Sequence, residues 1–522
     1  MKHHQGGAPP QRSQFAMPPP INRNLYALIR SRFPDREDAV FLEHEGGVVF
    51  YREIDARAAR IGAVLRGAGV SPGDRVCLQV EKSAEAVLLY LACLRMGAVC
   101  IPLNVAYTRD EVAYFLADAG PRVLVCAPER QEELAGIAPR GTGVFTLDGA
   151  GKGSLARAAD LAAPEGEPAR RTSDDLAAIV YTSGTTGRSK GAMLTHGNLS
   201  SNALALWRIW HWQQGDVLLH ALPIFHVHGL FVALHTAMLN GSKVIFQNRF
   251  DAGRVIERLG DATVLMGVPT FYTRLLDHPK FSREACAGMR LFISGSAPLL
   301  PETFARFEQV TGQRILERYG MSEAGMITSN PYEGERVPGT VGFALPDVQV
   351  RVADEHGRER PRGEVGVLEF TGPNVFAGYW KMPEKTAAEM RPDGWFITGD
   401  LAVMDGEGRV SIVGRARDLV ISGGYNVYPR EVEEAIDALP GVLESAVIGL
   451  PHDDLGEAVA AVVVARSGAS VAPDDVLAGL RGRLARYKQP RRVFMLDALP
   501  RNTMGKVQKN LLRERFARAF SG

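Results

Sequence analysis

Apolar and polar positions along the chain predict strands and helices that follow one another. From about residue 50 to 330, short runs rich in β-branched residues are separated by segments with helical spacing. Repeated strand, helix, strand units are typical of largely parallel sheets with helices on their faces, which is an α/β fold. The predicted strands begin near Arg75, Ala98, Arg122, Ala177, Asp216, Lys243, Thr263 and Arg290.

The pattern changes in the last third of the chain. Between residues 340 and 414 the helical spacing disappears and turn-bounded strands replace it, which indicates a β-rich subdomain. After Gly414 a helix over 430–439 and two apolar strands are enough for a small α+β domain.

The domain boundaries follow from these changes. We predict a large N-terminal domain over residues 21–415 and a small C-terminal domain over 416–522. Residues 1–20 are rich in Pro, Gln, His and Gly and cannot bury enough apolar surface to fold, so they are predicted to form a flexible tail.

Composition narrows the class of protein. The 522 residues are 46% hydrophobic and 23% charged, as in a globular enzyme, and the formal charge of +1 offers no field that would attract nucleic acid. No apolar run is long enough to cross a membrane, and the N-terminus lacks the apolar core of a secretory signal. The first acidic residue is Asp35, as in organellar transit segments, but the prolines before it would break the helix such a segment needs.

The five cysteines indicate a reducing compartment. They are odd in number, lie mostly in apolar runs and contain no CxxC pair, which is typical of buried thiols in a reducing environment. We therefore predict a cytoplasmic protein.

The most informative segment for function is a glycine-rich loop after an apolar strand. It reads Thr182-Ser183-Gly184-Thr185-Thr186-Gly187-Arg188-Ser189-Lys190-Gly191. Its glycines let the backbone approach a polyphosphate, and its hydroxyls and cations supply further donors. The order of residues differs from G-x-x-x-x-G-K-[ST], so a Walker-type kinase or ATPase is not supported.

The loop and six further motifs resemble those of the adenylate-forming ligases, which include acyl-CoA and aryl-CoA synthetases, luciferases and nonribosomal adenylation domains. The resemblance covers about residues 24–515 and implies that family's fold. The further motifs are GSAP (295–298), YGMSE (319–323), TGD (398–400), GRARD (414–418), SGGYNVYP (422–429) and RNTMGK (501–506).

The resemblance implies ATP, Mg²⁺ and CoA as reactants and assigns a role to each matched residue. Glu323 would hold Mg²⁺, Ser322 would bond the α-phosphate, and Asp400 with Arg415 would bind the ribose. The remaining ATP-binding residues implied are Thr182, Ser183, Gly184, Thr185, Thr186, Gly187, Lys190, Gly295, Ser296, Ala297, Tyr319 and Gly320.

The C-terminal domain would carry residues for both half-reactions. Lys506 matches the family's mobile catalytic lysine, which bridges the acid and the α-phosphate as charge develops. The resemblance further implies that this domain rotates after adenylation about a hinge at Arg417. Rotation would bring Gly423 and Gly424 to the CoA thiol, where residues without side chains leave a narrow channel.

The acid is indicated by an arginine within an apolar run. Arg274 interrupts VLMGVPTFYTRLL (264–276), and a buried guanidinium is costly unless it reaches solvent or meets an anion. The run resembles malonyl-CoA synthetases, in which an arginine here receives the distal carboxylate of a diacid. His226 and Ser296 would line the same pocket.

We therefore predict an AMP-forming ligase that activates malonate, and also methylmalonate, and that converts malonate to malonyl-CoA. It would bind a small dicarboxylate and act as a monomer or homodimer. Alternatives are a short- or medium-chain acyl-CoA or aryl-CoA synthetase, an adenylation enzyme that loads a carrier protein, and a non-catalytic nucleotide-binding protein.

Overall fold

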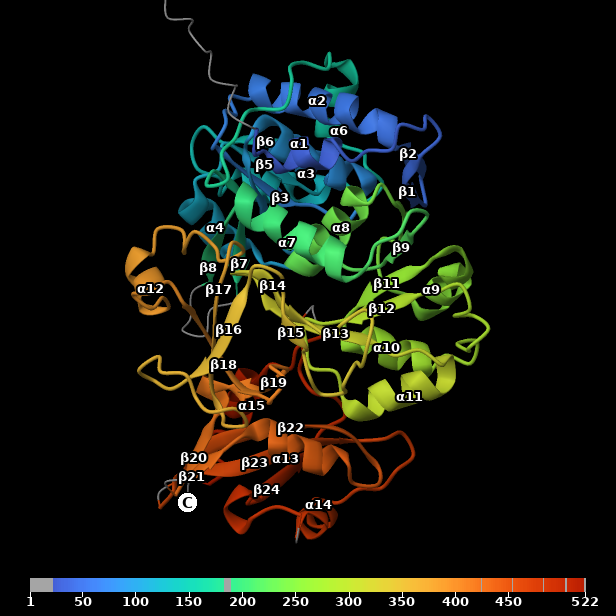
Figure 1. The fold of residues 1–522 in the computed structure, drawn as a ribbon. Coiled ribbons are helices and arrows are strands. Elements are labelled where there is room, and N and C mark those ends of the chain that lie inside the picture. The colour runs from blue at the N-terminus through green and yellow to red at the C-terminus, as the bar shows by residue number, and fades with distance from the viewer. Residues whose placement is uncertain are drawn as a thin grey trace, which may run out of the picture.

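Two large sheets make up most of the N-terminal part of the chain (Figure 1). The computed structural model describes residues 22–182, 189–423, 425–452, 454–481, 483–502 and 505–520. The predicted tail over 1–20 therefore lies outside the described residues.

The first sheet has six strands in the order β6-β5-β3-β4-β7-β8, parallel except for the final pair. Its strands are β3 (Arg75–Gln79), β4 (Val99–Pro102), β5 (Val123–Cys126), β6 (Gly143–Thr146), β7 (Leu176–Thr182) and β8 (Lys190–Thr195).

The second sheet has nine strands in the order β15-β14-β13-β12-β11-β9-β10-β1-β2. Its strands from β13 to β1 are parallel, whereas β14, β15 and β2 are antiparallel to their neighbours. The bounds are β1 (Val40–His44), β2 (Gly47–Phe50), β9 (Val217–His220), β10 (Lys243–Phe246), β11 (Val264–Gly267), β12 (Leu291–Ser294), β13 (Leu316–Met321), β14 (Gly325–Ser329) and β15 (Phe343–Ala344).

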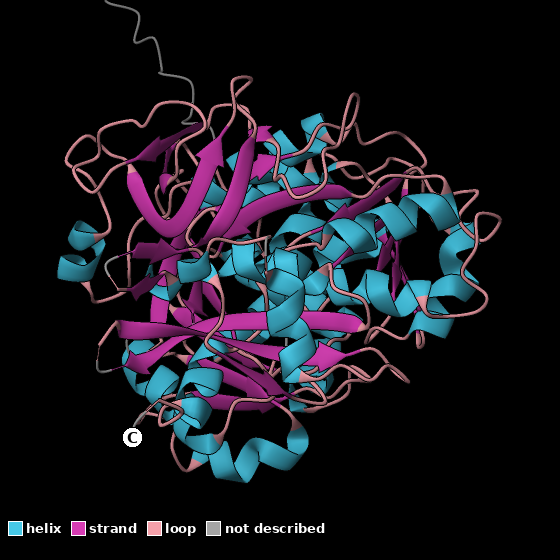
Figure 2. Ribbon diagram, turned by 90° about the horizontal axis from the view of Figure 1, so that it is seen from below, coloured by secondary structure: helices cyan, strands magenta, loops and turns pink. Residues whose placement is uncertain are grey.

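Helices cover the faces of both sheets, as Figure 2 also shows. They are α1 (Leu25–Arg30), α2 (Tyr51–Gly67), α3 (Ala84–Met96), α4 (Arg109–Ala119), α5 (Gln131–Ala135), α6 (Ser154–Leu161), α7 (His196–Ile209), the π-helical η2 (His228–Ala233), α8 (Leu234–Leu239), α9 (Ala252–Arg258), α10 (Pro269–Leu276) and α11 (Pro301–Thr311).

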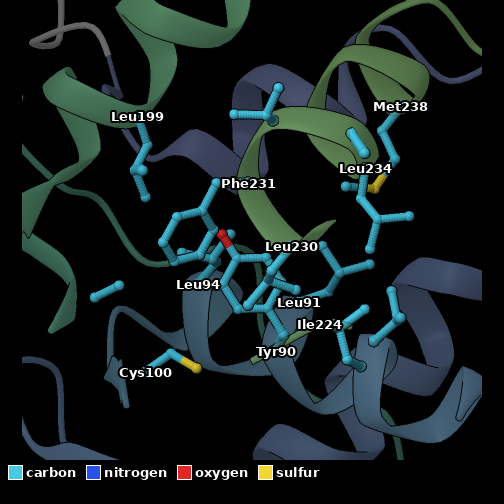
Figure 3. Close-up of a cluster of buried hydrophobic side chains, with 14 of the residues drawn as sticks. Tyr90, Leu91, Leu94, Cys100, Leu199, Ile224, Leu230, Phe231, Leu234 and Met238 are labelled. Carbon is cyan, nitrogen blue, oxygen red and sulfur yellow. The ribbon is translucent and has the colours of Figure 1, made fainter. Parts of the chain in front are cut away.

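The central core packs helices α3, α7, α8 and η2 together (Figure 3). Helix α3 is apolar on all sides, which suits a fully buried helix. The Ser83 side chain accepts a hydrogen bond from Ala86 N–H at its start, and Gly97 ends it with a left-handed φ of 77°. Tyr90 and Leu94 of α3 meet Phe231 of η2 in this core.

Two smaller sheets complete the chain. The predicted β-rich segment forms an antiparallel sheet of β16 (Gln349–Ala353), β17 (Gly366–Thr371), β18 (Phe396–Met404) and β19 (Val410–Arg415), with α12 (Pro383–Ala388) inserted between β17 and β18. The last sheet contains β20 (Val420–Ser422), β21 (Tyr425–Val427), β22 (Val442–His452), β23 (Gly456–Ala465) and β24 (Arg492–Met495). It packs with α13 (Pro429–Asp437), α14 (Pro473–Leu480) and α15 (Lys509–Phe516).

These four sheets confirm the predicted fold class. The five cysteines are free and buried, as the sequence indicates. Within the described ranges, none of the helices combines the length and the apolar character that crossing a membrane requires.

Candidate active site

A buried carboxylate marks the predicted ribose site. Asp400 in β18 is paired in register with Arg415 at the end of β19, and Arg415 Nε lies 2.8 Å from Asp400 Oδ1. The Tyr319 hydroxyl donates to the other carboxylate oxygen. Burial and the nearby Asp400 raise the pKa of Tyr319, so its hydroxyl keeps the proton that it donates. The carboxylate is only 3% exposed and is fixed in orientation, which suits an acceptor for two adjacent hydroxyls.

The ends of the glycine-rich loop converge on a polar network. Thr182 and Lys190 face each other in the β7–β8 pair. Lys190 Nζ lies 3.1 Å from Glu389 Oε1 and 4.1 Å from the centre of the Tyr379 ring. The intervening predicted residues Ser183, Gly184, Thr185, Thr186 and Gly187 lie outside the described residues.

Glu323, the predicted Mg²⁺ ligand, belongs to this network. It is 6% exposed, and its Oε1 lies 2.9 Å from the Tyr379 hydroxyl, which also lies 2.5 Å from Glu389 Oε2. Burial raises the pKa of Glu323, while Tyr379 and Lys190 act in the opposite direction. No three potential metal ligands cluster among the described residues. A single carboxylate still fits Mg²⁺, because this ion takes most of its other ligands from phosphates and water.

The predicted acid pocket is built around two histidines. Ser296 Oγ lies 3.2 Å from His228 Nδ1, and Ser296 has a φ of 71°, a strained value for a residue other than glycine. His226 Nδ1 accepts a hydrogen bond from the His228 backbone N–H. Burial, together with the charges of Arg318 and Lys506, lowers the pKa of His226 to about 4. The ring is therefore neutral near pH 7, and both cations act on it electrostatically.

Arg318 is the buried cation of this pocket. It is 3% exposed, and its Nε and Nη2 have no hydrogen-bond partner in the part of the chain that the structure describes. Its guanidinium lies against Gly295, where an added Cβ would come within 2.2 Å of Nη1. Burial lowers the pKa of Arg318. A buried guanidinium with free donors is costly, so pairing with an anion would relieve this cost.

Arg274 reaches solvent in this structure. The sequence argument left two outcomes for its guanidinium, solvent or an anion, and Arg274 is exposed and makes no hydrogen bond or ion pair with any residue in the described ranges. Its contact with a distal carboxylate stays a prediction. Helix α10 buries Tyr272, Leu275 and Leu276 instead. Arg274 follows Thr270 by one turn, and Gly505 lies so close to Thr270 that a Cβ on it would come 3.2 Å from Thr270 Oγ1. Helix geometry therefore places Arg274 on the face that carries Thr270.

Lys506 is held at the site by a short hairpin. Asn502 N–H donates to the Lys506 carbonyl at 2.9 Å, and Lys506 N–H donates to Asn502 Oδ1 at 2.9 Å. Gly505 supplies the left-handed φ of 74° that the turn needs. Burial lowers the pKa of Lys506 to about 8, and Arg415 adds to this effect while Asp400 opposes it. The ammonium is therefore within electrostatic range of the ribose pair and of His226.

The predicted hinge residue lies within electrostatic range of the ribose pair and Lys506, whereas the described CoA residue belongs to the C-terminal sheet. Arg417 is exposed in the short helix η4 (Ala416–Asp418), and the next residue, Asp418, pairs with Arg513 at 2.6 Å. Gly423, with a φ of 58°, begins the turn between β20 and β21, whereas Gly424 lies outside the described residues. Figure 1 places this hairpin at the outer edge of the C-terminal sheet.

The remaining predicted residues occupy the strand ends around the pocket. Ser322 is half-buried in the turn between β13 and β14, and Ala297 is half-buried after β12. Gly320 in β13 must be glycine for steric reasons, because a Cβ would come 2.1 Å from the Gly325 carbonyl oxygen. Sequence reasoning missed Arg318, Tyr379 and Glu389.

Comparison with known proteins identifies what the chain resembles. Residues 29–380 match the family described as AMP-binding enzyme, and residues 431–506 match the AMP-binding enzyme C-terminal domain. A feruloyl-CoA synthase of Amycolatopsis is 37% identical over 92% of this chain and 96% of the relative. The mitochondrial malonate–CoA ligase of Mus musculus is 35% identical over 91% of this chain and 88% of the relative.

Among solved structures, MatB from Rhodopseudomonas palustris is 53% identical and covers 96% of this chain and 100% of its own. The TM-score is 0.94 for its ATP-bound crystal structure and 0.83 for its apo structure. The described arrangement of the chain is therefore nearer to the ATP-bound one.

Proposed function

Because the chain belongs to the AMP-binding enzyme family, we propose that it activates malonate with ATP and transfers the malonyl group to CoA. In the first half-reaction a malonate carboxylate attacks the α-phosphorus, and pyrophosphate leaves. In the second, the CoA thiol attacks the acyl carbon, loses its proton and releases AMP. Family membership and the similar proteins confirm the predicted class of enzyme, an AMP-forming acid–thiol ligase that uses ATP, Mg²⁺ and CoA.

The observation that carries the choice of acid is the buried guanidinium of Arg318, whose Nε and Nη2 have no hydrogen-bond partner among the described residues. Malonate has two carboxylates, and only one of them reacts. In this proposal the other pairs with Arg318, while His226 and Ser296 line the pocket. Arg274, from the helix face that also carries Thr270, adds positive charge at the rim. A monocarboxylic acid would leave Arg318 unpaired, which favours diacids.

The remaining residues orient the nucleotide and stabilise the transition state. Asp400 and Arg415 hold the ribose, and Lys190 meets the phosphates. Lys506 places its ammonium between the attacking carboxylate and the α-phosphate, where negative charge develops. This role is supported by its position near Arg415 and His226.

Glu323 is the proposed Mg²⁺ ligand, with Ser322 beside it as a donor to the α-phosphate. Bound Mg²⁺ neutralises phosphate charge and favours the departure of pyrophosphate. Tyr379 fixes the Glu323 carboxylate through its hydroxyl, which keeps one oxygen directed within the polar network.

For the second half-reaction we propose that residues 416–522 rotate about Arg417. In this arrangement Lys506 is within electrostatic range of Arg415 and Asp400, while the β20–β21 hairpin lies at the outer edge of its sheet. Rotation would exchange them and bring Gly423 and Gly424 to the thiol of CoA.

We also propose a cytoplasmic location and a monomeric or homodimeric state. The five free, buried thiols support a reducing compartment.

Small diacids should be the best substrates in a comparison of pyrophosphate release. We expect malonate or methylmalonate to exceed acetate, octanoate and coumarate, because only diacids can pair with Arg318 while presenting a second carboxylate to ATP. The advantage of malonate over acetate should reach roughly a hundredfold in kcat/KM, which corresponds to about 3 kcal/mol.

The same assay separates the alternatives. Octanoate or coumarate as best substrate would contradict the proposal and favour a fatty-acyl or aryl-CoA synthetase. AMP formation that needs a carrier protein in place of CoA would contradict the choice of acceptor.

The adenylation rate should decline above about pH 8. Only the ammonium form of Lys506 carries the required charge, and its pKa is lowered to about 8. We expect kcat/KM for malonate, which reports ionisations of the free enzyme, to fall as the pH rises through this value. The residual activity of Lys506→Arg should lack that decline, because a guanidinium keeps its proton. A wild-type profile that stays flat to about pH 10 would argue against this assignment.

A further inference from the structure

A second buried cation lies behind the acid pocket. Lys82, which directly precedes the N-cap of α3, is 8% exposed. Its Nζ lies 2.6 Å from the Gln247 carbonyl oxygen, 3.0 Å from the His220 carbonyl oxygen and 2.8 Å from His220 Nδ1. It also lies 4.3 Å from the centre of the Phe246 ring. Within the described ranges no carboxylate forms an ion pair with Lys82.

The geometry around Lys82 favours an ammonium. Three acceptors surround the nitrogen, and a protonated lysine has three N–H donors. A neutral amine would turn its lone pair toward one of these acceptors. Burial lowers the pKa of Lys82 well below its usual value. The three acceptors and the Phe246 ring act in the opposite direction, because they favour the charged form.

His220 connects Lys82 to the acid pocket through hydrogen bonds. Its Nδ1 accepts from Lys82, so its proton is on Nε2, which lies 3.0 Å from the Gly229 carbonyl oxygen and donates to it. Burial lowers the pKa of His220, and the charge of Lys82 adds to that effect. The neutral imidazole therefore joins Lys82 to Gly229 by two directed hydrogen bonds.

Gly229 ends the turn that carries both pocket histidines. It follows His228 directly and lies in η2, whose Leu230 and Phe231 are anchored in the core (Figure 3). A Cβ at Gly229 would come 2.1 Å from the Pro223 carbonyl oxygen, so the backbone is closely packed there. The hydrogen bond from His220 Nε2 fixes the Gly229 carbonyl and so connects this turn to Lys82.

We propose that Lys82 is a positioning residue for the acid pocket and that its buried charge favours a dianionic acid over a monoanionic one. It acts through His220 on the turn that holds His226 and His228. Together with Arg318, it gives the surroundings of the pocket two cations that no described carboxylate neutralises. The inference rests on the proposed malonate activity, because a site for monocarboxylic acids would gain nothing from this charge.

Lys82→Met tests this role by its effect on discrimination between acids. We expect kcat/KM for malonate to fall about tenfold or more, which is typical of losing a hydrogen bond from a charged donor. kcat/KM for acetate should change much less, and KM for ATP should stay within about twofold, so the preference for malonate narrows. Lys82→Arg, which keeps a cation, should recover part of that preference.

Lys243→Met provides a matched control on the neighbouring strand β10. Lys243 is half-buried and pairs with Glu43 at 3.1 Å, away from His220, so its loss should leave the malonate preference unchanged. If Lys82→Met fails to fold, His220→Gln tests the same relay with the lysine in place.

Three results separate the possible interpretations. Equal losses with malonate and acetate in a folded Lys82→Met enzyme would reduce Lys82 to a structural role and overturn the inference. A Lys82→Met enzyme whose kcat/KM is unchanged for both malonate and acetate would overturn it as well. A wild-type enzyme that prefers a monocarboxylic acid would instead refute the proposed function, whatever the variants do.

Discussion

Replacing Lys506 with alanine should abolish most adenylate formation while the second half-reaction survives. Lys506 is the cation that the hairpin around Asn502 presents to the nucleotide site. Its ammonium is needed where charge develops on the attacking carboxylate and the α-phosphate, so its loss should lower adenylation by roughly a hundredfold or more. Pyrophosphate exchange measures this step, and thioester formation from supplied malonyl-adenylate measures the other.

A nearby lysine serves as the control for this variant. Lys509 lies three residues further on, at the start of α15, and pairs with Glu433 at 2.5 Å. Lys509→Ala removes the same charge from the same segment but none from the site, so both half-reactions should stay near the wild-type rates. Equal losses in both half-reactions of Lys506→Ala would show that this residue serves the fold or the second step as well.

The sequence predicts the kinds of elements well because the periodicity of apolar residues is local. Helix α3, for example, has a serine cap, thirteen residues and a closing glycine, all readable from neighbouring positions. Sheet membership is different. β5 joins the six-stranded sheet and β9 the nine-stranded one, yet both are short apolar runs. Which strands pair depends on contacts between distant residues, which a local pattern does not contain.

The same limit explains why the sequence analysis singled out Arg274 and missed Arg318. Arg274 attracts attention because it interrupts an apolar run, but a helix exposes one face, and Arg274 lies there. Arg318 follows a glutamate, so no local pattern marks it as buried. Its burial arises because β13 is enclosed between β12 and β14. Tyr379 and Glu389 were missed for a similar reason, since they meet Glu323 and Lys190 only in the folded chain.

Replacing Arg318 with methionine should nearly abolish the use of malonate while stabilising the free enzyme. In the proposed complex the pair between Arg318 and the distal carboxylate would be buried, and losing one partner of such a pair costs about 3 to 5 kcal/mol. We expect kcat/KM for malonate to fall roughly 10²- to 10³-fold, with acetate affected far less. Without substrate, the guanidinium has unpaired donors, so an apolar side chain of similar length should raise the midpoint of thermal unfolding.

Arg274→Met is the matched comparison for this variant, because Arg274 is exposed and has no hydrogen-bond or ion-pair partner among the described residues. Its loss should reduce malonate use less than the loss of Arg318 and should leave the unfolding midpoint unchanged, since surface substitutions rarely alter stability by more than about 0.5 kcal/mol. A reversed order, with Arg274→Met the more damaging for malonate, would assign the distal carboxylate to Arg274 after closure around substrate. A fall in the unfolding midpoint of Arg318→Met would instead mean that the buried guanidinium stabilises the fold, and the argument from its missing partner would fail.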